Sequence, residues 1–303
     1  MSDHTYQPTL SQLRAFVAVA EYRHFGTAAV RLNVSQPTLS QALAALETGL
    51  GLQLIERSTR RVLVTPAGKR LLPQAMATIE AADRFVSSAS GAGELLSGSL
   101  RMGLIPTVAP YVLPALLPAL REQMPGLALQ VVEDRTARLI DGLRAGVVDV
   151  AVLAVPSEAH AMLEIPLYAE PFEVVVPTGH PLAGRADVVP RELGGLPLLL
   201  LDEGHCLRDQ TLDLCRSHRA HPAAVGDTRA ASLATVVQCV AGGLGVSLIP
   251  RMAVPVETAR GVSTATFADP APGRTLGLVF RSSSARSEDY EHLADLMRRL
   301  RPD

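Results

Sequence analysis

The apolar and polar residues of the first fifty positions alternate with the period of amphipathic helices. Apolar side chains recur every three or four residues between positions 9 and 22, and an alanine-containing segment of similar pattern follows at 25–32. Ser35 is a favourable N-cap residue, and Pro37 suits the first turn of a third helix. We therefore predict three helices, the third of which buries leucines on one face. Its opposite, exposed face carries Gln36, Thr38, Ser40 and Gln41.

Two short strand-like runs and one long helix are predicted next. The runs 52–56 and 62–64 form a β-hairpin with a basic tip, and the helix extends from Thr65 to about Ala89. Apolar residues seven positions apart on this helix are typical of a seam that pairs two chains in a coiled coil. The seam residues are Leu72, Ile79 and Val86. Packing of a single amphipathic helix on its own domain is the alternative, and Pro73 disfavours an unbroken helix.

Beyond a linker rich in Ser and Gly (87–98), the pattern changes to strand-like runs separated by helical segments. This alternation is typical of an α/β fold, for which we expect a largely parallel sheet with ligands at the carboxyl ends of its strands. The expected strands are 100–105, 128–133, 148–153, 173–177, 196–201, 246–249 and 276–280. The predicted domains are a winged helix-turn-helix at 1–66 (helix-turn-helix at about 25–44), a linker and dimerisation helix at 67–90, and an effector domain at 91–303.

Charge is distributed unevenly along the chain. The net charge of −2 by itself gives no indication of nucleic-acid binding, but residues 1–70 contain eight Lys or Arg against four Asp or Glu. Amide and hydroxyl side chains on the third helix suit base edges in the major groove, and arginines in the hairpin suit phosphates or the minor groove. We predict a winged helix-turn-helix that binds double-stranded DNA. Its candidate contacts are Ser35, Gln36, Pro37, Thr38, Ser40, Gln41, Arg57, Arg60 and Arg61.

The patterns that the sequence lacks disfavour several other classes of protein. No uncharged apolar window reaches the roughly 18–20 residues of a membrane span, and the N-terminus has no signal-peptide pattern. We therefore expect a cytoplasmic protein without membrane contact. In that compartment its three cysteines favour a redox or catalytic role over a structural disulfide. The histidines show no metal-ligand spacing with the cysteines, so we expect neither a metal nor another cofactor.

Cys206 and Cys215 lie nine residues apart in a segment that we expect to be a helix beginning near Cys206. Backbone N–H groups at a helix N-terminus, together with Arg208 and a protonated or hydrogen-bonding His205, favour a thiolate at Cys206. Peroxide oxidises a thiolate to a sulfenic acid, which a second thiol converts to a disulfide. Within one helix the two Cα atoms would be about 13 Å apart, whereas a disulfide requires less than roughly 7 Å, so the bridge requires unwinding. The alternative is two unrelated cysteines, and we expect Cys239 to be an ordinary buried thiol.

The N-terminal segment resembles the DNA-binding domain of the LysR-type transcriptional regulators. The resemblance rests on Ser35-Gln36-Pro37-Thr38-Leu39-Ser40, Leu54-Ile55-Glu56-Arg57 and Thr65-Pro66-Ala67-Gly68, with the apolar positions before them. It implies a linker-helix coiled coil and a two-subdomain effector region of the periplasmic-binding-protein type. It also implies a dimer, usually assembled into a tetramer on promoter DNA, with RNA polymerase as a further partner.

The segment around Cys206 is similar to the redox segment of the peroxide-sensing members of this family. The matching residues are Gly204-His205-Cys206-Leu207-Arg208-Asp209-Gln210 and Cys215. The resemblance implies hydrogen peroxide as the signal, with Cys206 as the peroxidatic and Cys215 as the resolving cysteine. It further implies a peroxide pocket lined by Thr107, Thr136, His205 and Arg281, with Arg208 and Asp209 in support. Leu214 departs from the family, in which an aromatic residue often precedes the resolving cysteine.

Three functions are compatible with these patterns. We favour a peroxide-responsive DNA-binding regulator of oxidative-stress genes, which is not an enzyme. The alternative within the family is a regulator that binds a small metabolite in the effector cleft, for which Cys206 would be dispensable. A thiol peroxidase is disfavoured because such an enzyme has no use for a recognition helix and a basic wing.

Overall fold

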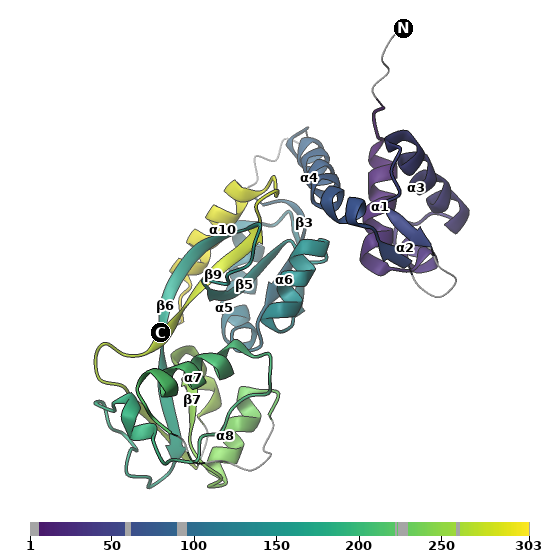
Figure 1. Ribbon diagram of the computed structural model, residues 1–303. Helices are drawn as coiled ribbons and strands as arrows, with labels where there is room; N and C mark the ends of the chain where they lie inside the picture. Colours follow the sequence, from purple (N-terminus) through teal and green to yellow (C-terminus); the bar gives the residue numbers. More distant parts are fainter. Residues whose placement is uncertain are drawn as a thin grey trace.

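A computed structural model describes residues 6–57, 62–89, 96–221, 223, 230–258 and 261–302. A small N-terminal domain is joined by one long helix, α4 (Pro66–Ala89), to an elongated effector region made of two subdomains (Figure 1). In the described part of the chain, no helix is long and apolar enough to cross a membrane.

The N-terminal domain contains the three predicted helices and the predicted hairpin. The elements are α1 (Leu10–Tyr22), α2 (Phe25–Arg31), α3 (Gln36–Leu50), β1 (Ile55–Arg57) and β2 (Val62–Val64). The Ser35 hydroxyl caps α3 by accepting a hydrogen bond from the Thr38 backbone N–H at 3.2 Å. The Glu47 carboxylate accepts from the backbone N–H groups of Leu54 (2.8 Å) and Ile55 (2.9 Å), which ties the hairpin to α3. The cap fixes where α3 begins, and the Glu47 contacts hold the second half of the helix against the hairpin.

Helix α4 runs without interruption through Pro73, contrary to the expectation from that residue. Leu72, 7% exposed, belongs to the hydrophobic core of its own DNA-binding domain, and Ile79 packs against the edge of that core. The prediction that Leu72 contributes to a seam between chains is therefore wrong. A seven-residue repeat shows which face of a helix is apolar, but not whether that face covers its own α1 or a second chain.

The first effector subdomain is built on three neighbouring strands that run in the same direction. They are β3 (Gly98–Leu104), β4 (Leu127–Glu133) and β5 (Val150–Val155), and β3 lies in the middle. Helices α5 (Ala109–Gln123) and α6 (Thr136–Ala145) are the crossover connections that parallel pairing requires. A C-terminal helix, α10 (Ser287–Arg299), packs on the long strand β6, defined below.

Two strands pass between the subdomains, β6 (Met162–Pro177) and β9 (Gly273–Arg281). The sheet order is β4-β3-β5-β9-β6-β7, with β8 also on β6. The second subdomain surrounds the far half of β6 (Figure 1). Its other elements are η1 (Pro190–Leu193), α7 (Cys206–Ser217), α8 (Leu233–Ala241), β7 (Ser247–Pro250), η2 (Arg251–Ala253), α9 (Val254–Glu257) and β8 (Val262–Thr266).

The expectation of a largely parallel sheet is wrong. Of the six described pairings in this sheet, only β3–β4 and β3–β5 are parallel. Strands β7, β8 and β9 all pair with β6 in the opposite direction, and β9 is also antiparallel to β5. The expected strand 196–201 makes only isolated bridges, β6 begins eleven residues before its expected start, and β8 was not expected.

Candidate redox site and DNA-binding surface

Helix α7 contains both cysteines that the sequence singles out. Cys206 is its first residue and is half-buried, whereas Cys215 lies nine residues on and is only 2% exposed. Both are free thiols, and burial raises the pKa of the Cys215 thiol. Two predictions are thus confirmed: Cys206 is at the N-terminus of a helix, and Cys215 lies in the same helix. Closing a disulfide between them requires α7 to unwind.

The imidazole of His205, at the N-cap position of α7, is buried with 5% exposure. Burial lowers the pKa of His205, the positive charge of Arg135 lowers it further, and the carboxylate of Asp202 acts in the opposite direction. The ring is therefore neutral near pH 7. Of the two roles considered for His205, its burial and the charge of Arg135 favour the neutral form over a positive charge beside Cys206.

The loop before Cys206 lies against the start of α6. The Arg135 guanidinium is 3.8 Å from the Asp202 carboxylate, and a Cβ atom added to Gly204 would lie 3.1 Å from Arg135 Cδ. The next residue, Thr136, has a buried hydroxyl without a hydrogen-bond partner among the described residues, as does the Asp202 Oδ1 atom. Buried polar atoms left without a partner are suited to a small polar guest such as water or hydrogen peroxide.

Thr107 occupies the loop after β3 and is also buried. Its hydroxyl accepts a hydrogen bond from Arg274 Nη1 at 2.8 Å, and its carbonyl accepts from Arg274 Nη2 at 3.0 Å. The Arg274 Nε atom donates in turn to Glu170 at 2.8 Å, inside the protein. Because Thr107 follows β3 and Thr136 follows the adjacent parallel strand β4, the two threonines share one edge of the sheet.

Arg281 does not belong to this edge, so its predicted place in the peroxide pocket is wrong. It ends β9, whereas Arg274 is the second residue of the same strand, and seven residues of strand span about 23 Å. The Arg281 guanidinium donates to the carbonyls of Leu143 (2.9 Å) and Val148 (3.1 Å) and to the Glu80 carboxylate of α4. Arg274 was missed, although a charged residue entering an apolar strand is a visible signal.

The two supporting residues have different surroundings. Arg208 Nη1 donates to the Leu201 carbonyl at 3.1 Å and so fixes the start of α7 to the segment before it. Asp209 is exposed in the first turn, where its charge complements the helix dipole. Leu214 and Cys239 are partly buried against the hydrophobic core. Across the described residues, no group of His, Cys, Asp or Glu side chains is arranged to hold a metal ion.

The predicted DNA contacts on α3 face away from the domain core. Ser35, Gln36, Pro37, Thr38 and Gln41 are exposed, and Ser40 is half-buried. The hydroxyls of Ser35 and Thr38 lie 2.7 Å apart, so capping already engages both. Arg60, Arg61 and the side chain of Arg57 lie outside the described residues.

Two family descriptions match this architecture. Residues 10–69 match the bacterial regulatory helix-turn-helix proteins of the lysR family, and residues 93–301 match the LysR substrate binding domain. The second match alone covers more than half of the chain. The chain therefore belongs to the LysR family of transcriptional regulators.

Within that family, the chain is similar to proteins named for their response to peroxide. A probable hydrogen peroxide-inducible genes activator from Mycobacterium avium is 58% identical over 302 residues, which cover 99% of this chain and 96% of the relative. The full-length OxyR structure from Pseudomonas aeruginosa has a TM-score of 0.80 at 38% identity, covering 96% of this chain and 98% of that one. A peroxide-bound cysteine-to-serine mutant of Corynebacterium glutamicum OxyR has a TM-score of 0.68 at 53% identity, covering 98% and 93%.

Proposed function

We propose that this chain is a hydrogen-peroxide-sensing, DNA-binding transcriptional regulator of oxidative-stress genes. The observation that carries the proposal is helix α7, which begins at Cys206 and buries Cys215 nine residues later. A half-buried thiol at a helix N-terminus meets the conditions for a reactive cysteine, and a second thiol in the same helix is available to resolve it. Relatives that share nearly the whole chain are named as peroxide-inducible activators.

The chemistry proceeds in two balanced steps. The Cys206 thiolate attacks one oxygen of hydrogen peroxide, the O–O bond breaks, and the hydroxide that leaves takes up a proton to become water. The Cys215 sulfur then attacks the sulfur of the Cys206 sulfenic acid. The S–S bond forms, the S–O bond breaks, and the departing hydroxide leaves as water with the proton of Cys215. One peroxide is reduced to two waters while the two thiols together lose two electrons.

The peroxide pocket in this proposal comprises Thr107, Thr136 and His205. Arg274 takes the place predicted for Arg281, because its guanidinium is the one bonded to the Thr107 hydroxyl. A neutral His205 and the unpartnered Thr136 hydroxyl provide hydrogen bonds for a peroxide molecule that carries no charge.

The DNA-binding part of the proposal places α3 in the major groove, with its exposed Gln36 and Thr38 at base edges. Two chains pair through the last turns of α4, where Phe85 is 77% exposed and Val86 of the predicted seam is 64% exposed. Tetramer formation on promoter DNA and contact with RNA polymerase are further parts of the proposal, as is a cytoplasmic location, where the bacterial chromosome lies.

Mass mapping of cysteine states tests the proposal most directly. The full chain is exposed briefly to a low dose of peroxide, its free thiols are alkylated, and its peptides are mapped. We expect a sulfenic acid on Cys206 first and a Cys206–Cys215 disulfide afterwards, with Cys239 unchanged. A Cys239→Ser variant is the control and gives the same pattern. Unmodified Cys206 in a chain that still responds at its promoter would favour the metabolite-binding alternative.

A further inference from the structure

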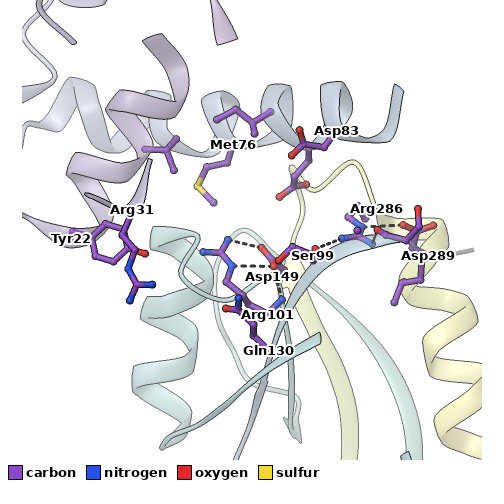
Figure 2. A pocket seen from close by; sticks show the side chains of 16 residues that line it. Tyr22, Arg31, Met76, Asp83, Ser99, Arg101, Gln130, Asp149, Arg286 and Asp289 are labelled. Atoms are coloured by element: carbon purple, nitrogen blue, oxygen red, sulfur yellow. Dashed lines mark hydrogen bonds and ion pairs between the residues drawn. The ribbon is translucent and has the colours of Figure 1, made fainter. Parts of the chain in front are cut away.

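A hollow of about 490 Å³ lies where the DNA-binding domain, helix α4 and the effector region meet. Side chains of all three parts line it, among them Arg31 of α2, Met76 of α4 and Arg101 of β3 (Figure 2). Arg101 pairs with Asp149 of its own subdomain at 2.9 Å and approaches Glu21 of α1 at 3.7 Å. The Arg101–Glu21 ion pair thus links the effector region to the DNA-binding domain.

Glu80 of α4 makes three hydrogen bonds to the effector region at this junction. Its carboxylate accepts hydrogen bonds from Arg281, from the Ser284 hydroxyl at 3.0 Å and from the Ala285 backbone N–H at 3.3 Å. Arg281 is only 3% exposed and also donates to the carbonyl of Leu143, near the end of α6. Glu80 is thus bonded to the effector region through a buried, charge-assisted contact.

Helix α4 also contacts the end of α6 directly, one helical turn before Glu80. Gly146 ends α6 with φ = +70°, and a Cβ atom added there would lie 1.6 Å from the Met76 methyl carbon. Met76 and Glu80 are four residues apart and therefore lie on one face of α4. This face meets α6 both through packing and through the hydrogen bonds of Arg281.

The other end of α6 lies against the redox loop. Arg135 immediately precedes α6, contacts the Asp202 carboxylate at 3.8 Å and lies next to Gly204. Helix α6 has ten residues and so is about 15 Å long. A single short helix therefore connects the loop that precedes Cys206 with the face of α4 that carries Met76 and Glu80.

We propose that Glu80 is a positioning residue that transmits oxidation of Cys206 to the DNA-binding domain of the same chain, through Arg281 and α6. The inference rests on the function proposed above. Unwinding of α7 displaces the loop on which Arg135 rests, and α6 moves as a rigid body. Gly146 and Leu143 then shift against Met76 and Glu80, which reorients α4 and the recognition helix attached to it.

The test compares the full-length variants Glu80→Gln and Asp83→Asn. Glu80→Gln removes the negative charge and keeps the shape of the side chain. Asp83→Asn is the matched control, because it removes a charge from the same helix at a residue that pairs with Arg14 of the DNA-binding domain at 2.8 Å. Disulfide formation with peroxide is measured by mass mapping. Footprints of the reduced and oxidised forms are compared on one promoter fragment that the unaltered chain protects.

We expect Glu80→Gln to form the Cys206–Cys215 disulfide at the normal rate but to give the same footprint in both redox states. Asp83→Asn should keep the difference between the two footprints. If Glu80→Gln keeps that difference as well, transmission through Glu80 is wrong while the peroxide-sensing function stands. If the unaltered chain forms no disulfide, the proposed function fails and the inference fails with it.

The reduction potential of the disulfide gives a second readout, which a merely structural role of Glu80 would not change. Coupling between two binding equilibria is reciprocal, so operator DNA should shift the midpoint potential of the disulfide in the unaltered chain. We expect this shift to disappear in Glu80→Gln and to persist in Asp83→Asn. An undiminished shift in Glu80→Gln would overturn the assignment.

Discussion

The two ends of strand β9 each bury an arginine, and the two guanidinium groups have different surroundings. At the start of the strand, Arg274 is bonded to the Glu170 carboxylate and to Thr107, at the edge that also carries Thr136. At the end of the strand, Arg281 is bonded to two backbone carbonyls and to Glu80 of the linker helix. One end of the strand thus belongs to the candidate redox pocket and the other to the junction with the DNA-binding domain.

The comparison teaches that strand direction decides which of two similar residues reaches a site. In a parallel sheet, the carboxyl end of β9 would lie at the ligand edge and Arg281 would reach Thr107. Because β9 runs antiparallel to β5, with Val155 opposite Thr275, its first residues reach that edge instead. The experiments below separate the two ends of β9.

Cys206→Ser should have the largest effect, because it removes the chemistry from the redox end and leaves the junction end intact. We expect complete loss of the transcriptional response to peroxide, with unchanged thermal stability and unchanged operator binding by the reduced form. A promoter reporter with and without peroxide measures the response. An undiminished response in this variant would contradict the redox mechanism.

Arg274→Ala tests the redox end of β9. The substitution leaves the Glu170 carboxylate buried without its cation, which costs roughly 3–5 kcal/mol of unfolding free energy, and it frees the Thr107 hydroxyl. We expect urea denaturation to show this loss and stopped-flow measurements to show slower oxidation of Cys206. Arg281→Lys is the comparison variant and should leave the oxidation rate unchanged. If Cys206 oxidation slows equally in both variants, the redox pocket does not distinguish the two ends of β9.

Gln36→Ala tests the proposed DNA-binding surface on α3. Loss of one base contact should weaken the discrimination between operator and random DNA by about 1–3 kcal/mol, without changing Cys206 oxidation. Binding titrations at a fixed salt concentration with both DNAs measure it. A uniform loss on both DNAs would assign Gln36 to the phosphate backbone instead.

Gly146→Ala tests the contact between α6 and α4. Alanine at a left-handed position costs about 1–2 kcal/mol, and here its Cβ atom must also displace the Met76 side chain. Gly179→Ala is the matched control, because Gly179 has φ = +85° and no atom within 4 Å of an added Cβ. We expect a similar backbone strain in both variants, but an altered redox-dependent footprint only in Gly146→Ala. If the footprints of both variants are unchanged, the contact between α6 and α4 does not contribute to the coupling between redox state and DNA binding.

The smallest effect should be the pH dependence contributed by His205. Its folded-state pKa lies below the ordinary value of 6.5, so the unfolded chain takes up the proton first as the pH falls. Stability should therefore decrease as the pH falls below about 6.5 and level off below the folded-state pKa. Denaturation of the unaltered chain and of His205→Asn between pH 7.5 and 5 isolates this contribution. An identical pH dependence in both chains would contradict a buried neutral imidazole.

Features that depend on neighbouring residues could be predicted from the sequence. The boundaries of α1 to α3 follow from capping residues and periodicity, and the start of α7 at Cys206 follows from the change of pattern there. Both kinds of signal act within one or two helical turns, and a single sequence contains them in full.

Features that depend on how distant segments pair could not be predicted in this way. The orientation of β9, and with it the position of Arg274, is set by pairing with β5 and β6, which lie more than a hundred residues earlier in the chain. The apolar repeat that includes Leu72 is the same whether α4 packs on its own domain or pairs with a second chain. Only the tertiary contact with its own domain shows what covers Leu72.

In the proposed mechanism, the burial of Cys215 sets an upper limit on the peroxide dose to which the switch responds reversibly. While α7 remains wound, a sulfenic acid on Cys206 waits for its resolving thiol, and during that interval a second peroxide molecule competes for the same sulfur. The product of this competition is a sulfinic acid, which cellular thiols do not reduce. A brief pulse of peroxide therefore forms a disulfide that can be reduced again, whereas a sustained excess oxidises Cys206 irreversibly. The stability of the twelve-residue helix α7 thus determines the peroxide dose above which oxidation of Cys206 becomes irreversible.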